Sequence, residues 1–248
     1  MLRHQIEVSV MRIVDRMVDG TFLERVNKFL TVVEVNKTRV PCFLPDPGRL
    51  DDLLYPGVSV ILAERPRKGR KTRFDLIAVY HNDQLISLDS RVPNKLVFEA
   101  LRKGVFEEFS EYSTITPEFK YHGSRIDFLL ENGKRSCLVE VKSCTTVING
   151  VALFPSAPTL RGRRHLVELM NALEEGYRSC VLFVVQRTDA KVLRPHDQID
   201  RKFGETLREA SEKGVEVYAY FSEFREREIT IRGRIPVDLS TRPRKPSR

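Results

Sequence analysis

The sequence predicts a two-domain protein in which an all-β domain is followed by an α/β domain. Two observations carry this prediction: short strand-like runs separated by turn residues fill the first part of the chain, and strands alternate with helices after it. We place the domains at 1–90 and 91–239, because the pattern of short strands gives way to alternating strands and helices near 88–93. The remaining segment, 240–248, is basic, rich in proline and without apolar anchors, so we expect a disordered tail.

The first domain contains short runs with the composition of β-strands. Turn residues such as Asp19-Gly20 and Asn36-Lys37 separate these runs. Short strands at this spacing, with little helix between them, predict a small closed barrel or a sandwich. The runs are 6–14, 29–35, 38–44, 58–63, 74–81 and 84–88.

The second domain alternates between two kinds of apolar pattern. Helical spacing of apolar residues, ended in each case by a glycine, predicts helices over 93–103, 160–175 and 200–213. Strand-like runs fall at 125–130, 136–142, 180–185 and 215–221. Because strands alternate with helices, we expect a mixed or partly parallel sheet that is covered by helices.

The composition narrows the classes of function. Lys and Arg number 42 against 34 Asp and Glu, a net charge of +8. A basic balance favours a polyanionic partner such as DNA, and a basic protein with no nucleic-acid role is the alternative.

No apolar stretch is long enough to span a membrane, and the first residues lack a secretory pattern, so we expect a cytoplasmic protein. A homodimer is the default expectation for its assembly.

Two acids and a lysine on neighbouring strands are the first candidates for a functional site. Glu140 and Lys142 share one face of the run 136–142, because side chains alternate along a strand. Asp127 lies in the preceding run, and Asn132-Gly133 can turn the chain between the two runs. If the runs pair as a hairpin, Asp127 and Glu140 come together with Lys142 beside them.

This grouping has a chemical use. The carboxylates of Asp127 and Glu140, completed by the backbone carbonyl of Val141, suit Mg²⁺ or Mn²⁺, and the metal can activate a water. Lys142 can orient that water or offset charge on a phosphate oxygen. The alternative is a solvated strand face with cross-strand ion pairs. Apolar flanks favour the site, because charges at the edge of a core are costly without a function.

Three further residues are candidates around the acids. Glu118 or Glu99 can supply another carboxylate, although Glu118 also fits an ordinary exposed strand residue. Gln186 ends a fully apolar run, where its amide can contact the site or cap the strand.

Two basic segments are candidates for phosphate contacts. Arg161, Arg164 and His165 fall at the start of a predicted helix, where cations are not needed for helix stability and where a phosphate fits. The segment 65–73 has six basic residues out of nine and reads as a loop that contacts the phosphate backbone. A solvated basic turn is the alternative in both cases. The candidates in the second segment are Arg67, Lys68, Arg70 and Lys71.

Several segments together resemble the sugar fermentation stimulation protein A family. They are LPDPGRL (44–50), YPG (55–57), PNKLV (93–97), SRIDFLL (124–130), VEVKS (139–143), FPSAPTLRGRRHL (154–166), LFVVQR (182–187) and GVEVYAY (214–220). The resemblance extends to about residue 239. It implies an N-terminal OB-like barrel and a C-terminal restriction-endonuclease-like domain of the PD-(D/E)XK nuclease superfamily.

The resemblance also implies roles for the acids and the lysine. Asp127 and Glu140 match the metal-binding acids of the nuclease pattern, and Lys142 matches its catalytic lysine. This implies a DNA-binding protein with a Mg²⁺-dependent phosphodiesterase site; the alternative is a non-catalytic DNA-binding protein that regulates sugar metabolism genes. The chain departs from the family at Ser156, where an Asp is usual, and at 144–146, where V-T-L is usual.

Overall fold

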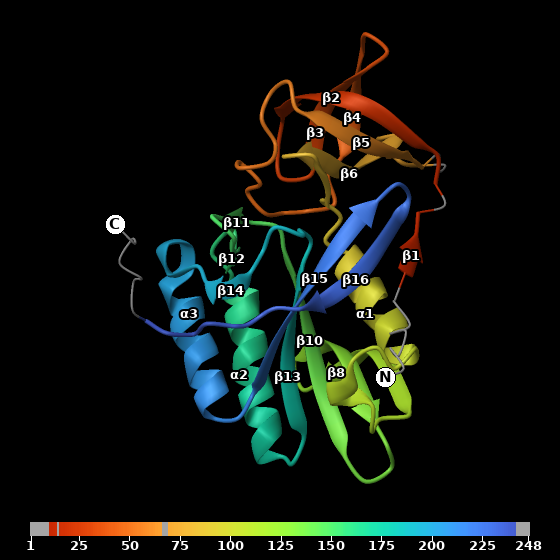
Figure 1. The fold of residues 1–248 in the computed structure, drawn as a ribbon. Coiled ribbons are helices and arrows are strands. Elements are labelled where there is room, and N and C mark those ends of the chain that lie inside the picture. The colour runs from red at the N-terminus through yellow and green to blue at the C-terminus, as the bar shows by residue number, and fades with distance from the viewer. Residues whose placement is uncertain (1–9, 14, 66–68, 242–248) are drawn as a thin grey trace, which may run out of the picture.

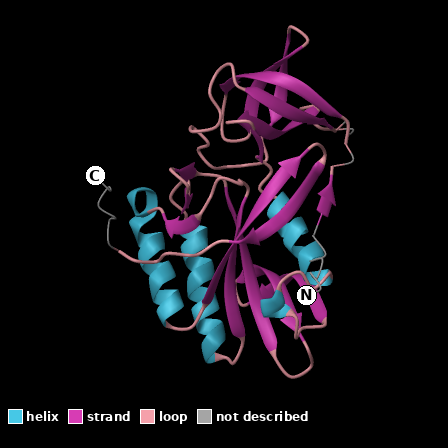
Figure 2. Cartoon of the chain, in the orientation of Figure 1, coloured by secondary structure: helices cyan, strands magenta, loops and turns pink. Residues whose placement is uncertain are grey.

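The computed structural model describes residues 10–13, 15–65 and 69–241. A β-barrel forms one end of the molecule and an α/β domain forms the other (Figure 1). The described helices all belong to the α/β domain (Figure 2). The predicted fold class is confirmed, and the expected tail over 240–248 lies almost entirely outside the described residues.

Five strands close the barrel. They pair in the order β4-β3-β2-β5-β6, and a parallel pairing between β4 and β6 completes the circle. The interior is filled by large apolar side chains such as Phe22, Val33 and Leu62. The strands are β2 (Met17–Arg25), β3 (Leu30–Val35), β4 (Thr38–Phe43), β5 (Ser59–Glu64) and β6 (Phe74–His81).

The first barrel strand differs from the sequence prediction. The described part of the run 6–14 forms β1 (Val10–Arg12), which pairs with β16 (Glu228–Arg234) of the α/β domain and not with the barrel. The barrel instead uses β2, which contains the Asp19-Gly20 pair that the sequence predicts as a turn. Gly20 is required by close packing, since a Cβ there would lie 2.5 Å from Cγ1 of Val33. Strand composition predicts an extended segment but does not identify its partner.

The sheet of the α/β domain is mixed, as expected. The run β15-β13-β10 is parallel, whereas β9 and β8 continue it antiparallel. The predicted hairpin is confirmed, because β9 pairs with β10 across the turn at Asn132-Gly133. The strands are β8 (Thr114–Tyr121), β9 (Ser124–Glu131), β10 (Ser136–Cys144), β13 (Arg178–Val185) and β15 (Glu216–Arg225).

Helices cover both faces of this sheet. The helix α1 (Val92–Arg102) packs on one face, and α2 (Leu160–Glu174) and α3 (Asp197–Glu212) pack on the other (Figure 1). The single turn η1 (Glu107–Phe109) follows α1. All three predicted helices are confirmed within a few residues of their expected ends.

Two smaller elements complete the domain and join it to the barrel. A three-stranded sheet consists of β11 (Val147–Ile148), β12 (Val151–Phe154) and β14 (Val192–Pro195). The strand β7 (Gln84–Ser87) pairs with β6 of the barrel and, at Leu85, with Phe224 of β15. The two domains therefore share one continuous path of hydrogen-bonded strands.

A buried carboxylate organises the barrel next to this junction. Asp75 is completely buried and pairs with three arginines: Arg65 at 3.4 Å, Arg91 at 3.2 Å, and Arg70. Arg91 directly precedes α1 and also bonds Asp89. A buried charge is tolerated only when it is paired in this way, so the cluster ties the barrel loop to the start of α1.

We expect Asp75→Asn to lower the free energy of unfolding by about 3 kcal/mol, because three guanidinium groups then lose the buried carboxylate that they share, although Arg91 keeps Asp89 and Arg65 keeps Asp15. Denaturant unfolding of the full chain, followed by circular dichroism, measures the change. Glu34→Gln on the same barrel is the control, since Glu34 is exposed and its substitution should change little. Equal stability of wild type and Asp75→Asn would contradict this role for the cluster.

Candidate active site on the β9–β10 hairpin

The two acids meet where β9 and β10 separate. The last paired residues of the hairpin are Val139 and Phe128. Glu140, which comes after Val139, and Asp127, which comes before Phe128, are therefore the first residues beyond the paired part. The freed backbone N–H of Val141 donates to Oδ2 of Asp127 at 2.8 Å. In a strand the N–H and C=O of one residue point to the same side, so the Val141 carbonyl also faces Asp127.

Glu140 is an almost fully buried acid with two cationic or polar partners. It is 3% exposed, and its Oε1 accepts hydrogen bonds from Nζ of Lys142 and from Nδ1 of His165 on α2. Its other oxygen, Oε2, is buried and has no hydrogen-bond partner among the described residues. A buried carboxylate oxygen left open in this way suits a bound cation.

Asp127 is contacted from α1, which covers the other face of the sheet from α2, the helix that carries His165. Nδ2 of Asn94, in the first turn of α1, donates to Oδ1 of Asp127 at 2.6 Å. With the contact from Val141, both oxygens of Asp127 have one donor each. The side chain is therefore held in a single orientation beside Glu140.

The surroundings shift the pKa values of Asp127 and Glu140 in opposite directions. Burial raises the pKa of Asp127 to about 6, and the charge of Glu140 acts in the same direction. Burial by itself raises the pKa of Glu140 as well, but the charge of Lys142 and the hydrogen bond from His165 outweigh it, so the pKa of Glu140 lies below its ordinary value. The surroundings of Glu140 thus favour its ionised form, whereas those of Asp127 favour its neutral form unless a bound cation stabilises the carboxylate.

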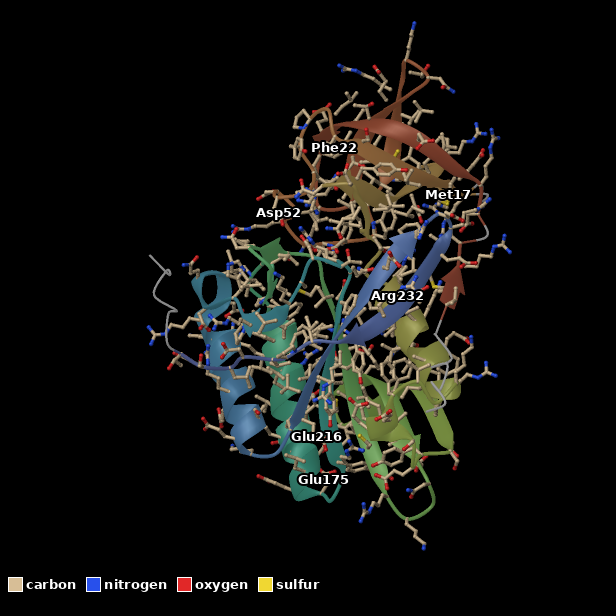
Figure 3. All side chains as sticks on the ribbon, in the orientation of Figure 1. Met17, Phe22, Asp52, Glu175, Glu216 and Arg232 are labelled. Carbon is tan, nitrogen blue, oxygen red and sulfur yellow. The ribbon has the colours of Figure 1, made fainter. Side chains whose placement is uncertain are left out.

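A pocket of about 350 Å³ opens beside Asp127, next to the buried Glu140 that His165 contacts. Asp127 and His165 line it together with three arginines. Arg161 and Arg164 come from the first turns of α2, whose other end at Glu175 lies remote from the barrel (Figure 3). The N-terminus of α2 is therefore at the pocket, where its partial positive charge adds to that of the arginines. The third arginine is Arg125 of β9.

Some predicted site residues take other positions. The side chain of Glu118 is 73% exposed and bonds Arg125 at 3.1 Å, so it lies at the rim of the pocket and not with the two acids. The amide Nε2 of Gln186 donates to Oγ of Ser143 at 2.9 Å, and Ser143 alternates with Lys142 onto the opposite face of the sheet. Gln186 therefore does not join the carboxylates.

The predicted phosphate-binding residues are divided between the pocket and the barrel. Arg161 and Arg164 are exposed at the pocket, whereas His165 is buried against Glu140. Arg70 turns inward to Asp75, and Lys71 is exposed. Arg67 and Lys68 lie outside the described residues.

The sequence analysis assigned no role to Asn94 and no location to Ser156. Asn94 precedes the fully buried Val97 by three residues, so the two lie on the same side of α1. A polar side chain on this apolar side is the signal that could have marked Asn94 as a site residue. Ser156 lies against the barrel loop, since a Cβ at Gly48 would be 2.7 Å from Oγ of Ser156. The departure from the family pattern thus falls at the contact between the domains.

The fold and the hairpin define a class: a small closed β-barrel joined to an α/β domain that carries two acids and a lysine on paired strands. Residues 23–88 match the family model described as "SfsA N-terminal OB domain", and residues 91–228 match the model described as "Sugar fermentation stimulation protein RE domain". The chain belongs to the sugar fermentation stimulation protein family.

Relatives extend over most of the chain. The sugar fermentation stimulation protein homolog of Caldanaerobacter subterraneus is 44% identical over 223 residues, which is 90% of this chain and 97% of the relative. The homolog of Moorella thermoacetica is 47% identical over 206 residues, or 82% of this chain and 89% of the relative. The solved structure of Pyrococcus furiosus SfsA in complex with Ca²⁺ aligns with a TM-score of 0.84 at 28% identity, covering 92% and 99% of the two chains.

The raised pKa of Asp127 predicts a pH-dependent effect of removing its charge. A folded-state pKa of about 6 against 3.8 means that the folded protein binds the proton more tightly, so this group lowers stability as pH rises from about 4 to about 6. The stability of Asp127→Asn relative to wild type should therefore increase by roughly 2 kcal/mol between pH 4 and pH 7. Chemical unfolding with a chelator present measures this, and a difference that does not vary with pH would contradict it.

Proposed function

We propose that the protein binds nucleic acid and hydrolyses phosphodiester bonds in DNA with a divalent cation at Asp127 and Glu140. The observation that carries the proposal is the buried Oε2 of Glu140, which has no hydrogen-bond partner in the described part of the chain. It lies next to Lys142 and to Asp127, and Asp127 lines a pocket together with three arginines. A protein that only binds DNA gains nothing from two acids facing a polyanion, which argues against the non-catalytic alternative.

The donor set fits Mg²⁺ or Mn²⁺. Asp127, Glu140 and the carbonyl of Val141 would hold the ion through oxygen atoms, and both metals accept such ligands together with water. Across the described ranges no group of three or more His, Cys, Asp and Glu side chains could hold a metal, so the set is two carboxylates plus the backbone. When bound, the cation would supply an activated water and neutralise charge on the phosphate. The Ca²⁺ named for the Pyrococcus furiosus relative supports a site for a divalent cation.

The other residues have separate tasks. Arg161 and Arg164 would bind the phosphate at the mouth of the pocket, with the N-terminus of α2 behind them. Lys142, held beside Glu140, is placed to offset the charge that develops on the reacting phosphate. His165 is a positioning residue: it bonds Oε1 of Glu140 and so leaves Oε2 as the oxygen that would bind a cation.

Wild-type protein should cut single-stranded, double-stranded or branched DNA in Mg²⁺ or Mn²⁺. Asp127→Asn, Glu140→Gln and Lys142→Ala should each lower the rate by roughly a hundredfold or more, because the first two each remove a cation ligand and the third removes the ammonium that offsets charge on the phosphate. Timed cleavage of labelled oligonucleotides, resolved on gels, measures the rates.

Glu131→Gln, on the same hairpin, is the matched control and should retain the wild-type rate. The proposal fails if wild type and the three site variants show the same background cleavage. Binding without cleavage by correctly folded wild type would instead favour the non-catalytic, regulatory alternative.

The described part of the chain has no helix that is long and apolar enough to cross a membrane.

A further inference from the structure

A stacked aromatic pair lies on the barrel, with one ring exposed and the other half-buried. Phe29, in the turn between β2 and β3, stacks on Phe43 of β4 with ring centroids 6.0 Å apart and planes 18° from parallel. The Phe29 side chain is 46% exposed, whereas phenylalanine side chains are usually buried. The pair lines a groove of about 550 Å³ together with Leu30.

Cations surround this groove. Its lining includes Arg70, Lys71 and Arg91 and no acidic residue. The guanidinium groups of Arg70 and Arg91 each lie 6.0 Å from the centroid of the Phe43 ring, and both are fixed by Asp75 beneath. Aromatic faces bordered by fixed cations are the features that bind an unpaired base together with its phosphates.

The backbone that presents Phe29 is rigid. Oδ1 of Asn27 accepts the N–H groups of Phe29 and Leu30, each at 3.0 Å. The guanidinium of Arg25 bonds the carbonyls of Lys28 at 2.9 Å and of Gly48 at 2.6 Å, joining two loops of the barrel. Phe29 is therefore held in place before any ligand arrives, which lowers the entropic cost of binding.

The groove is connected to the candidate active site through α1. Arg91 precedes the helix and lies over Phe43, while Asn94 in its first turn holds Asp127. Three residues of helix rise only about 4.5 Å. A strand that lies in the groove thus approaches the same helix turn that positions the metal-binding acid.

We propose that the groove formed by Phe29, Phe43, Arg70, Lys71 and Arg91 binds single-stranded nucleic acid by stacking an unpaired base on Phe29. This inference rests on the proposed function and adds the strandedness of its substrate. Bases in a duplex are already stacked on each other, so the exposed ring of Phe29 selects an unpaired base. The arginines and Lys71 bind the adjacent phosphates.

The test measures binding of a labelled oligonucleotide to the full chain in a chelator, so that no cleavage occurs. Phe29→Ala should weaken single-strand binding roughly tenfold, while Phe29→Tyr, which keeps the ring, should bind as wild type does. Duplex binding should change little. Separate DNA and RNA strands identify which backbone is accepted, and the loss on either one supports the groove.

Tyr80→Ala is the matched control. Tyr80 is 44% exposed on the same barrel but lies beside Asp19 and Glu34, so its removal should not affect binding. In addition, replacing bases by abasic sites should weaken binding to wild type more than to Phe29→Ala. Wild-type affinity of Phe29→Ala for both single strands, or an equal loss for Tyr80→Ala or for the duplex, would overturn the proposal.

The outcome is separable from that of the nuclease proposal. If the binding pattern holds but wild type does not cleave with Mg²⁺ or Mn²⁺, the stacking groove stands and the nuclease function fails. If cleavage requires Asp127 and Glu140 but Phe29→Ala binds like wild type, the active site stands and the groove fails.

Discussion

The charge of Glu140 is the constraint on which the centre of this structure depends. An ionised carboxylate at 3% exposure is stable only because Lys142 and His165 both bond one of its oxygens. His165 can do so only if α2 covers this face of the sheet, and Asp127 can approach only because the pairing of β9 with β10 covers Phe128 to Glu131 and leaves Asp127 outside it. From the other face, α1 brings Asn94 to Asp127. The end of the strand pairing and the helices on both faces of the sheet therefore together hold Asp127 and Glu140 next to each other.

Much of the fold was predictable because local pattern determined it. Helical spacing located α1, α2 and α3, and the turn at Asn132-Gly133 located the β9–β10 hairpin. Partners over long sequence distances were not predictable: β1 pairs with β16, more than two hundred residues away. The strand β2 was missed because Asp19-Gly20 has turn composition, and only the side chain of Val33 on the next strand explains the glycine.

The site was predictable where it depended on strand alternation and not where it depended on tertiary packing. Alternation alone put Glu140 and Lys142 on one face, and their contact agrees with it. His165 looked like a phosphate ligand because its neighbours are arginines, yet the rotation of α2 turns it inward to Glu140. The Phe29–Phe43 stack joins a turn to a strand fourteen residues further on, and no local pattern in the sequence indicates that the two rings meet.

The central claim is that Asp127 and Glu140 form one divalent cation site, and direct metal binding tests it without any substrate. Titration of the full chain with Mn²⁺, followed by electron paramagnetic resonance of the free ion, gives stoichiometry and affinity. A single site made by these two acids should bind about one Mn²⁺ per chain in wild type. Asp127→Asn and Glu140→Gln should each bind it at least tenfold more weakly, since each loses a charged oxygen ligand. Wild-type stoichiometry and affinity in both variants would contradict this claim.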